Sequence, residues 1–93
     1  MVIKLLTIDL HLPGRSSLKE KRFVLSSVKA RLANQFNVAV AEVGYQSKWQ
    51  RALLAVVTVG VDGRAAENTC DKVVNYLQRD HRLSILDCTR EVR

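Results

Sequence analysis

The chain has 93 residues and a formal net charge of +6; 47% of its residues are hydrophobic and 26% are charged. This length and composition predict a single domain, residues 1–93, with a modest core. It has no apolar run near the roughly 20 residues that cross a bilayer and no signal-peptide pattern, so we expect a cytoplasmic protein without a membrane segment. Cys70 and Cys88 are too few for a disulfide framework or a zinc site. We expect both to be small core residues, with a disulfide between them as the first alternative and a reactive thiol as the second.

The first predicted element is a half-buried strand over residues 2–12, where apolar and polar side chains alternate. Its polar face carries Thr7, Asp9 and His11. Pro13 and Gly14 follow and end the strand.

A helix is predicted to follow, up to about Gln35. Ser17 is placed as its N-cap, and Glu20 three residues later predicts a capping box. Its apolar stripe, which has a helical period, contains Leu18, Leu25, Val28, Leu32 and Phe36, with Val24 at the margin. Between Arg15 and Arg31 lie six Lys or Arg residues and one acid, so this segment holds +5 of the total charge.

The remaining elements complete a recognisable order. We expect strands over residues 38–43, 51–61 and 83–91, a loop over residues 44–50 and a second helix over residues 65–80. The third strand is apolar on both faces, as a central strand would be. Right-handed crossovers then predict an α+β, ferredoxin-like βαββαβ fold, a four-stranded antiparallel sheet with two helices on one face.

Four short blocks resemble those of the YlxP-like family of small bacterial proteins. The blocks are Ser17-Leu18-Lys19-Glu20-Lys21-Arg22, Phe36-Asn37-Val38, Ala41-Glu42-Val43 and Trp49-Gln50-Arg51-Ala52. The resemblance implies the ferredoxin-like fold and the bacterial cytoplasm, and no established activity. Members are often encoded beside translation and ribosome-maturation genes, which suggests RNA or ribosomes by association. Cys88 departs from the aromatic residue expected in relatives.

The concentration of charge on one helix suggests contact with a polyanion, because cations there can neutralise phosphates. The predicted contacts are Lys19, Arg22 and Lys29, which fall along one flank of the helix, and Arg15, which extends this cluster from the preceding loop. Arg31 falls on the other flank. Lys21 falls on the apolar side, so we expect its amine to reach water past the helix end. The alternative interpretation is a solvated helix face that keeps the protein soluble.

The loop after the second strand adds Tyr45, Lys48, Trp49 and Arg51, a mixture of aromatic and basic residues found in single-strand binders. We include Lys48, Trp49 and Arg51 among the candidate RNA contacts, although Trp49 is also suited to packing on the hairpin or on a second subunit. The two middle strands lack exposed aromatic residues, which argues against a standard RNA-recognition domain. Phe23 lies opposite the apolar stripe, where it would contact a partner, stack on a base or be covered by a loop.

The sheet face away from the helices is also predicted to be apolar. Ile3 and Leu5 contribute to it, together with either Leu53, Ala55, Val57 and Val59 or Leu54 and Val56. Such a patch on a small chain is typical of an interface, and a homodimer is the simplest closed assembly.

Asp9 and His11 share one strand face, with Asp87 as a predicted neighbour, and a pair of this kind could act as general acid and base. The alternative interpretation is surface polar residues or an ion pair at a dimer seam. No nucleophile, metal-ligand spacing, phosphate loop or cofactor motif accompanies Asp9 and His11, and Asp80, His81 and Arg82 are interpreted as a polar turn. We therefore expect a non-enzymatic dimeric module that contacts RNA or a ribonucleoprotein. The alternative is a protein-interaction or scaffold domain that uses the apolar sheet and Phe23, and an enzyme comes third.

Overall fold

All six predicted elements form, in the predicted order. The computed structural model describes residues 1–93, and its elements are β1 (Val2–His11), α1 (Leu18–Gln35), β2 (Val38–Gly44), β3 (Arg51–Gly60), α2 (Gly63–Gln78) and β4 (Ser84–Val92). The bounds of α2 differ most from the prediction. Asp62 is its N-cap, accepting a hydrogen bond from the Ala65 backbone N–H at 2.9 Å, so the helix begins at Gly63 instead of residue 65.

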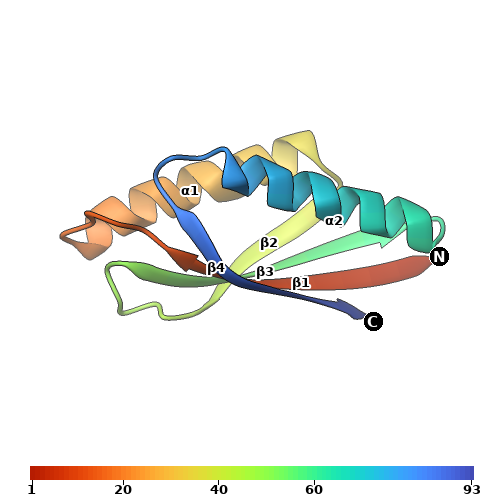
Figure 1. Cartoon of the computed structure of the whole chain (residues 1–93), viewed down its shortest axis with the longest axis horizontal. Coiled ribbons are helices and arrows are strands. Elements are labelled where there is room, and N and C mark those ends of the chain that lie inside the picture. The colour runs from red at the N-terminus through yellow and green to blue at the C-terminus, as the bar shows by residue number, and fades with distance from the viewer.

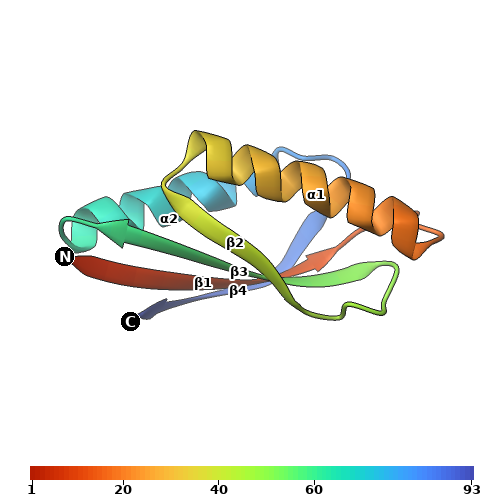
Figure 2. The ribbon, with the colours of Figure 1, turned by 180° about the vertical axis from the view of Figure 1, so that it is seen from behind.

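The four strands form one antiparallel sheet with the order β2-β3-β1-β4. Both helices cover the same face of this sheet, and the opposite face carries no element (Figures 1 and 2). The fold is therefore the predicted ferredoxin-like α+β arrangement, with β1 and β3 as its middle strands.

The core lies between the helix layer and the covered sheet face. Alternate side chains of β1 and β3 point into it, because successive residues of a strand face opposite sides. Its fully buried members include Leu6, Ile8, Leu10, Leu54, Val56, Val28, Leu32, Val73 and Leu77. None of the helices has the length and apolar character that crossing a membrane requires.

The uncovered sheet face is apolar over β2, most of β3 and the first half of β1, as predicted. The rest of this face is polar, because Thr7, Asp9 and His11 of β1 and Asp87, Thr89 and Glu91 of β4 lie on it. Ile3 pairs with Val59 and Leu5 with Val57 across β1 and β3. The residues of β3 that point away from the helices are Leu53, Ala55, Val57 and Val59, and β2 adds Ala39, Ala41 and Val43. We call these nine residues the open face.

The two cysteines lie on the covered side of the sheet, near the ion pairs that join α2 to β1 and β4. Glu67 of α2 pairs with Lys4 and Arg90, and Asp71 pairs with Arg90 at 2.7 Å. Cys70 is buried and Cys88 is partly buried against the core; both are free thiols, so the alternative of a disulfide does not form. Burial raises the pKa of both thiols.

Candidate nucleic-acid interface

The first turn of α1 is held by the two serines that precede it. Ser17 is the N-cap, and its Oγ accepts a hydrogen bond from the Glu20 backbone N–H at 3.2 Å. The predicted capping box is only half formed, because the Glu20 carboxylate accepts from the N–H and Oγ of Ser16, at 2.9 and 3.1 Å, and not from Ser17. These bonds to Ser16 lower the pKa of Glu20 and fix an ionised acid at the helix start.

Lys21 is buried, and the expectation that its amine reaches water is wrong. Its side chain is 1% exposed, and Nζ lies 2.9 Å from Glu42 Oε2 of β2 and donates to the Tyr45 carbonyl at 2.6 Å. Glu42 faces the helix layer because it alternates with the open-face residues of β2. A buried ammonium requires such partners, since an unpaired charge there costs several kcal/mol. The pair therefore attaches α1 to β2 and to the loop that follows it.

The loop between β2 and β3 lies against the segment that joins β1 to α1. Gln50 connects them: its side-chain amide donates to the Arg15 carbonyl at 3.1 Å, and its own carbonyl accepts from the Leu12 N–H at 2.9 Å. The start of α1 and this loop consequently occupy the same end of the molecule, opposite both chain termini (Figures 1 and 2).

Most of the predicted RNA contacts meet at this end. Four cations at this end form no ion pair with any carboxylate: Arg15, Lys19, Arg22 and Lys48. Two aromatic side chains accompany them, Phe23 at 75% exposure and Trp49 at 52%. No loop covers Phe23, and Arg15, Lys19, Glu20 and Phe23 line one hollow of about 260 Å³. We call the set Arg15, Lys19, Arg22, Phe23, Lys48 and Trp49 the basic end.

Lys29 and Arg51 differ from the other predicted contacts. Lys29 also forms no ion pair, but it lies about 15 Å further along α1 than Lys19. Arg51 is engaged by its own chain: its Nη2 donates to both carboxylate oxygens of Asp9, at 3.0 and 2.8 Å, and its guanidinium carbon lies 4.6 Å from the centre of the Tyr45 ring. The positive charge of Arg51 is thus largely compensated within the chain.

The structure does not join Asp9 to His11 as an acid–base pair. Asp9 binds Arg51, and no hydrogen bond connects it to His11. Asp87 lies opposite Asp9 in the sheet, as predicted, but its carboxylate accepts from the Cys88 backbone N–H at 2.9 Å. No group of three or more His, Cys, Asp or Glu side chains is placed to hold a metal ion.

A second group of cations was missed by the sequence interpretation. Arg31 of α1 faces the segment after α2 that contains Arg79 and Arg82, where only a polar turn was predicted. The run Arg79-Asp80-His81-Arg82 was the available signal, but its proximity to Arg31 depends on how the two helices pack.

Comparison with known proteins places the chain in a family. A profile of the family described as "Protein of unknown function (DUF503)" matches residues 3–90, nearly the whole chain. This chain belongs to the DUF503 family. It is also similar to "Uncharacterized protein YlxP" of Bacillus subtilis (strain 168), with 38% identity over 61 residues. That match spans 66% of this chain and 66% of the relative, just under two thirds of each.

The resemblance to YlxP-like proteins is therefore confirmed, and the structure gives its blocks a physical role in this DUF503 chain. Three of the four blocks meet at the basic end, where Lys21 pairs with Glu42 and Gln50 holds the Arg15 carbonyl. The fourth block lies at the start of β2, where the Asn37 carbonyl accepts from Thr58 Oγ1 at 2.7 Å.

Proposed function

We propose that the protein binds single-stranded RNA through the basic end. The observation that carries this proposal is the set of four cations without carboxylate partners beside two exposed aromatic side chains. Cations of this kind neutralise phosphates and release counterions, and exposed rings provide platforms on which bases stack. Single strands suit this surface better than duplexes because their bases are free to stack.

The local electrostatics support the proposal. Lys19 and Arg22 lie in the first two turns of α1, where cations oppose the helix macrodipole by a few tenths of a kcal/mol each. Six of the nine acids in the chain are in ion pairs. Of these six, Glu42 lies beneath the surface, Asp9 neutralises Arg51 beside the loop, and the other four lie elsewhere. The positive field at the basic end is therefore offset mainly by Glu20.

The sheet itself has little to offer RNA. Ferredoxin-like RNA binders stack bases on aromatic residues of the two middle strands. Here the corresponding open-face positions of β1 and β3 carry aliphatic side chains, and Arg51 is already paired. The proposed RNA site is consequently the end of the molecule, with Lys29 extending it along α1.

The fluorescence of Trp49, the only tryptophan, tests the proposal directly. Titration with an unlabelled single-stranded RNA should quench or shift its emission saturably, because base stacking changes the environment of the indole. The double variant Lys19→Ala with Arg22→Ala should weaken binding by about tenfold or more. A control with the same loss of charge, Arg64→Ala with Lys72→Ala, removes unpaired cations of α2. Equal weakening by both pairs, or no saturable change with the unaltered protein, would count against an RNA site at the basic end.

We also propose that a second copy of the chain covers the open face, giving a homodimer. The exposure of Val43, Val57 and Val59 in an otherwise apolar patch favours this occupant. The nine residues carry no charge, and the charged Asp9, Arg51, Asp87 and Glu91 lie on the same sheet face outside them. A two-fold axis through the patch would bring apolar surface against apolar surface.

Sedimentation velocity tests the dimer. Val57→Lys places a charge in the middle of the open face, so it should produce monomers at concentrations where the unaltered protein is dimeric. Val61→Lys is the matched control, because Val61 is 83% exposed and lies beyond the end of β3. A monomeric unaltered protein at micromolar concentration would contradict the homodimer and leave the open face to a different protein partner.

A further inference from the structure

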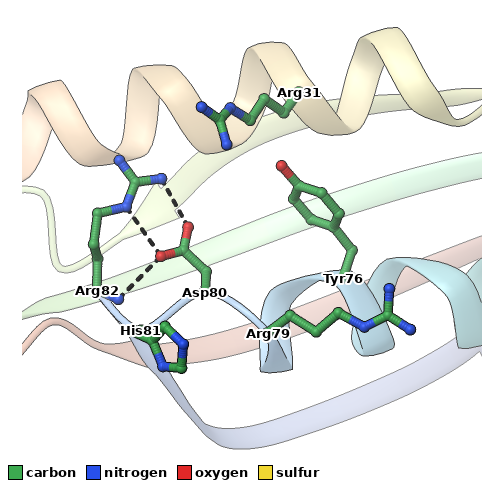
Figure 3. A pocket seen from close by; sticks show the side chains of 6 residues that line it. All are labelled: Arg31, Tyr76, Arg79, Asp80, His81 and Arg82. Atoms are coloured by element: carbon green, nitrogen blue, oxygen red, sulfur yellow. Dashed lines mark hydrogen bonds and ion pairs between the residues drawn. The ribbon is translucent and has the colours of Figure 1, made fainter.

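A hollow of about 500 Å³ lies between α1 and the turn that joins α2 to β4, away from both surfaces considered above. We call it the arginine hollow. The residues that line it are Arg31, Tyr76, Arg79, Asp80, His81 and Arg82. Figure 3 shows Arg31 projecting from α1 above it, Arg82 and Tyr76 on opposite sides, and Asp80 between them. Arg79 extends below Tyr76 along α2, with its guanidinium directed away from Asp80, and His81 lies below Asp80.

The hollow has excess positive charge. It contains three guanidinium groups and one carboxylate, and Arg31 and Arg79 form no ion pair. Asp80 is ionised, because the hydrogen bonds from the Arg82 side chain lower its pKa. Two positive charges are thus left uncompensated, which outweighs the half negative charge that the C-terminus of α2 contributes as a helix dipole.

Three of the groups around the hollow, Arg82, Asp80 and the Tyr76 ring, are held in place by contacts within the protein. Arg82 donates to both carboxylate oxygens of Asp80, at 2.7 and 3.0 Å, and its backbone N–H donates to the same carboxylate at 3.0 Å. Its Nη2 lies 3.5 Å from Ser27 Oγ, which links the turn to α1. The Tyr76 ring packs edge-on against Phe36, with centroids 6.1 Å apart.

The Tyr76 hydroxyl is free to bind a ligand. It points across the hollow toward α1 and Arg31, and no protein group forms a hydrogen bond with it (Figure 3). Beside it, the Arg31 guanidinium presents donors in a planar fork that matches the oxygens of a phosphate. A phenol donor and a guanidinium facing one space are the kind of groups that bind a phosphate group.

From this arrangement we infer that the arginine hollow binds a phosphate monoester, with Arg31 and the Tyr76 hydroxyl as direct ligands and Arg79 at the rim. A phosphate monoester carries about −1.5 to −2 charge at neutral pH, which matches the uncompensated charge better than a carboxylate does. The hollow has the volume of a small-molecule site, so there is room for the group that carries the phosphate. A free mononucleotide and the 5′-phosphate end of an RNA strand share this chemistry.

¹H–¹⁵N NMR spectra of the whole protein, which report backbone amides and arginine side-chain N–H groups, test the inference. Inorganic phosphate and adenosine 5′-monophosphate should produce saturable shifts at residues 79–82 and at the Arg31 side chain. A short RNA with a 5′-phosphate is compared with the same RNA bearing a 5′-hydroxyl. Preference for the mononucleotide assigns a small-molecule source, and preference for the phosphorylated RNA assigns a strand end; either supports the phosphate site. No saturable shift with any phosphate monoester would overturn it.

Substitutions separate this site from the basic end. Arg31→Gln should weaken phosphate binding about tenfold and Tyr76→Phe by less, because a hydrogen bond to a charged partner is lost in each. Arg64→Gln is the control, since it removes an unpaired arginine at the other end of α2 and should leave binding unchanged. The variant lacking Lys19 and Arg22 should still bind adenosine 5′-monophosphate normally, so the RNA proposal and this inference fail or stand separately. Equal losses from Arg31→Gln and Arg64→Gln would contradict the phosphate site.

Discussion

Lys21 Nζ and Glu42 Oε2 lie 2.9 Å apart beneath the helix layer, in an ion pair that joins α1 to β2. The same ammonium binds the Tyr45 carbonyl, at the start of the loop that contains Lys48 and Trp49. Two residues from separate family blocks therefore set the position of the loop relative to the first turns of α1. This relationship brings the cations in the first turns of α1 and the exposed tryptophan to the same end of the molecule.

Removing one member of this pair should destabilise the fold. Lys21→Met leaves the Glu42 carboxylate buried without its counter-charge, so we expect the free energy of unfolding to fall by about 3 kcal/mol or more. Urea denaturation followed by circular dichroism measures the change. The double variant Lys21→Met with Glu42→Leu should recover most of the loss, because neither charge then remains. A loss below about 1 kcal/mol in the single variant would indicate that water reaches the pair.

Asp80 should make stability depend on pH in the acid range. Its pKa in the folded protein lies below the ordinary value because the Arg82 side chain donates to the carboxylate. The folded state therefore binds this proton less readily than the unfolded chain, and the resulting stabilisation is present above about pH 4 and lost as the pH falls through the lowered pKa. Asp80→Asn should cost about 1 kcal/mol near neutral pH, with a difference from the unaltered protein that shrinks on acidification. A difference that stays constant across an acid titration of unfolding would contradict this.

Arg51 and Lys48 should respond differently to the same loss of charge. Arg51→Gln breaks the ion pair with Asp9 and the contact with Tyr45, so we expect stability to fall by about 1 kcal/mol with little change in RNA affinity. Lys48→Gln removes an unpaired, exposed cation, so RNA affinity should fall while stability is unchanged. Parallel thermal unfolding and RNA titrations distinguish the two. A larger loss of RNA affinity with Arg51→Gln than with Lys48→Gln would contradict this prediction. It would show that Arg51 leaves Asp9 to bind phosphate.

The two thiols should be slow to react in the folded protein. Burial raises the pKa of both, and Cys70 is fully covered while Cys88 is partly covered. Because the thiolate is the reactive form, an aromatic disulfide reagent should label Cys88 slowly and Cys70 only upon unfolding. Cys88→Ser should remove the faster phase. Rapid native labelling of both thiols would show that α2 opens readily from the sheet.

Much of the architecture is predictable because its signals are local. The alternation around Leu6, Ile8 and Leu10 determines β1, and the helical period of α1 with its Ser17 cap determines where that helix starts. The apolar character of both faces of β3 likewise predicted the open face. These patterns depend only on residues close together in the sequence: alternate residues of a strand face opposite sides of the sheet, and a helical period places apolar residues on one side of a helix.

The missed features depend on contacts between distant segments. Nothing near Lys21 shows that Glu42 will face it, so its position on the apolar side suggested an amine extending to water. The arginine hollow escaped prediction for the same reason, because Arg31 and Arg82 meet only when α1 packs beside the end of α2. Glu20 also shows that a correct spacing does not determine which serine its carboxylate binds.

The salt dependence of RNA affinity tests the central proposal most directly. For a single strand, the logarithm of the association constant falls with the logarithm of salt concentration by about 0.7 per neutralised phosphate. If Lys19 and Arg22 each contact one phosphate, replacing both by alanine should reduce that slope by about 1.4, whereas replacing Arg64 and Lys72 should leave it unchanged. An RNA affinity insensitive to salt, or the same slope in both double variants, would contradict a phosphate-binding basic end.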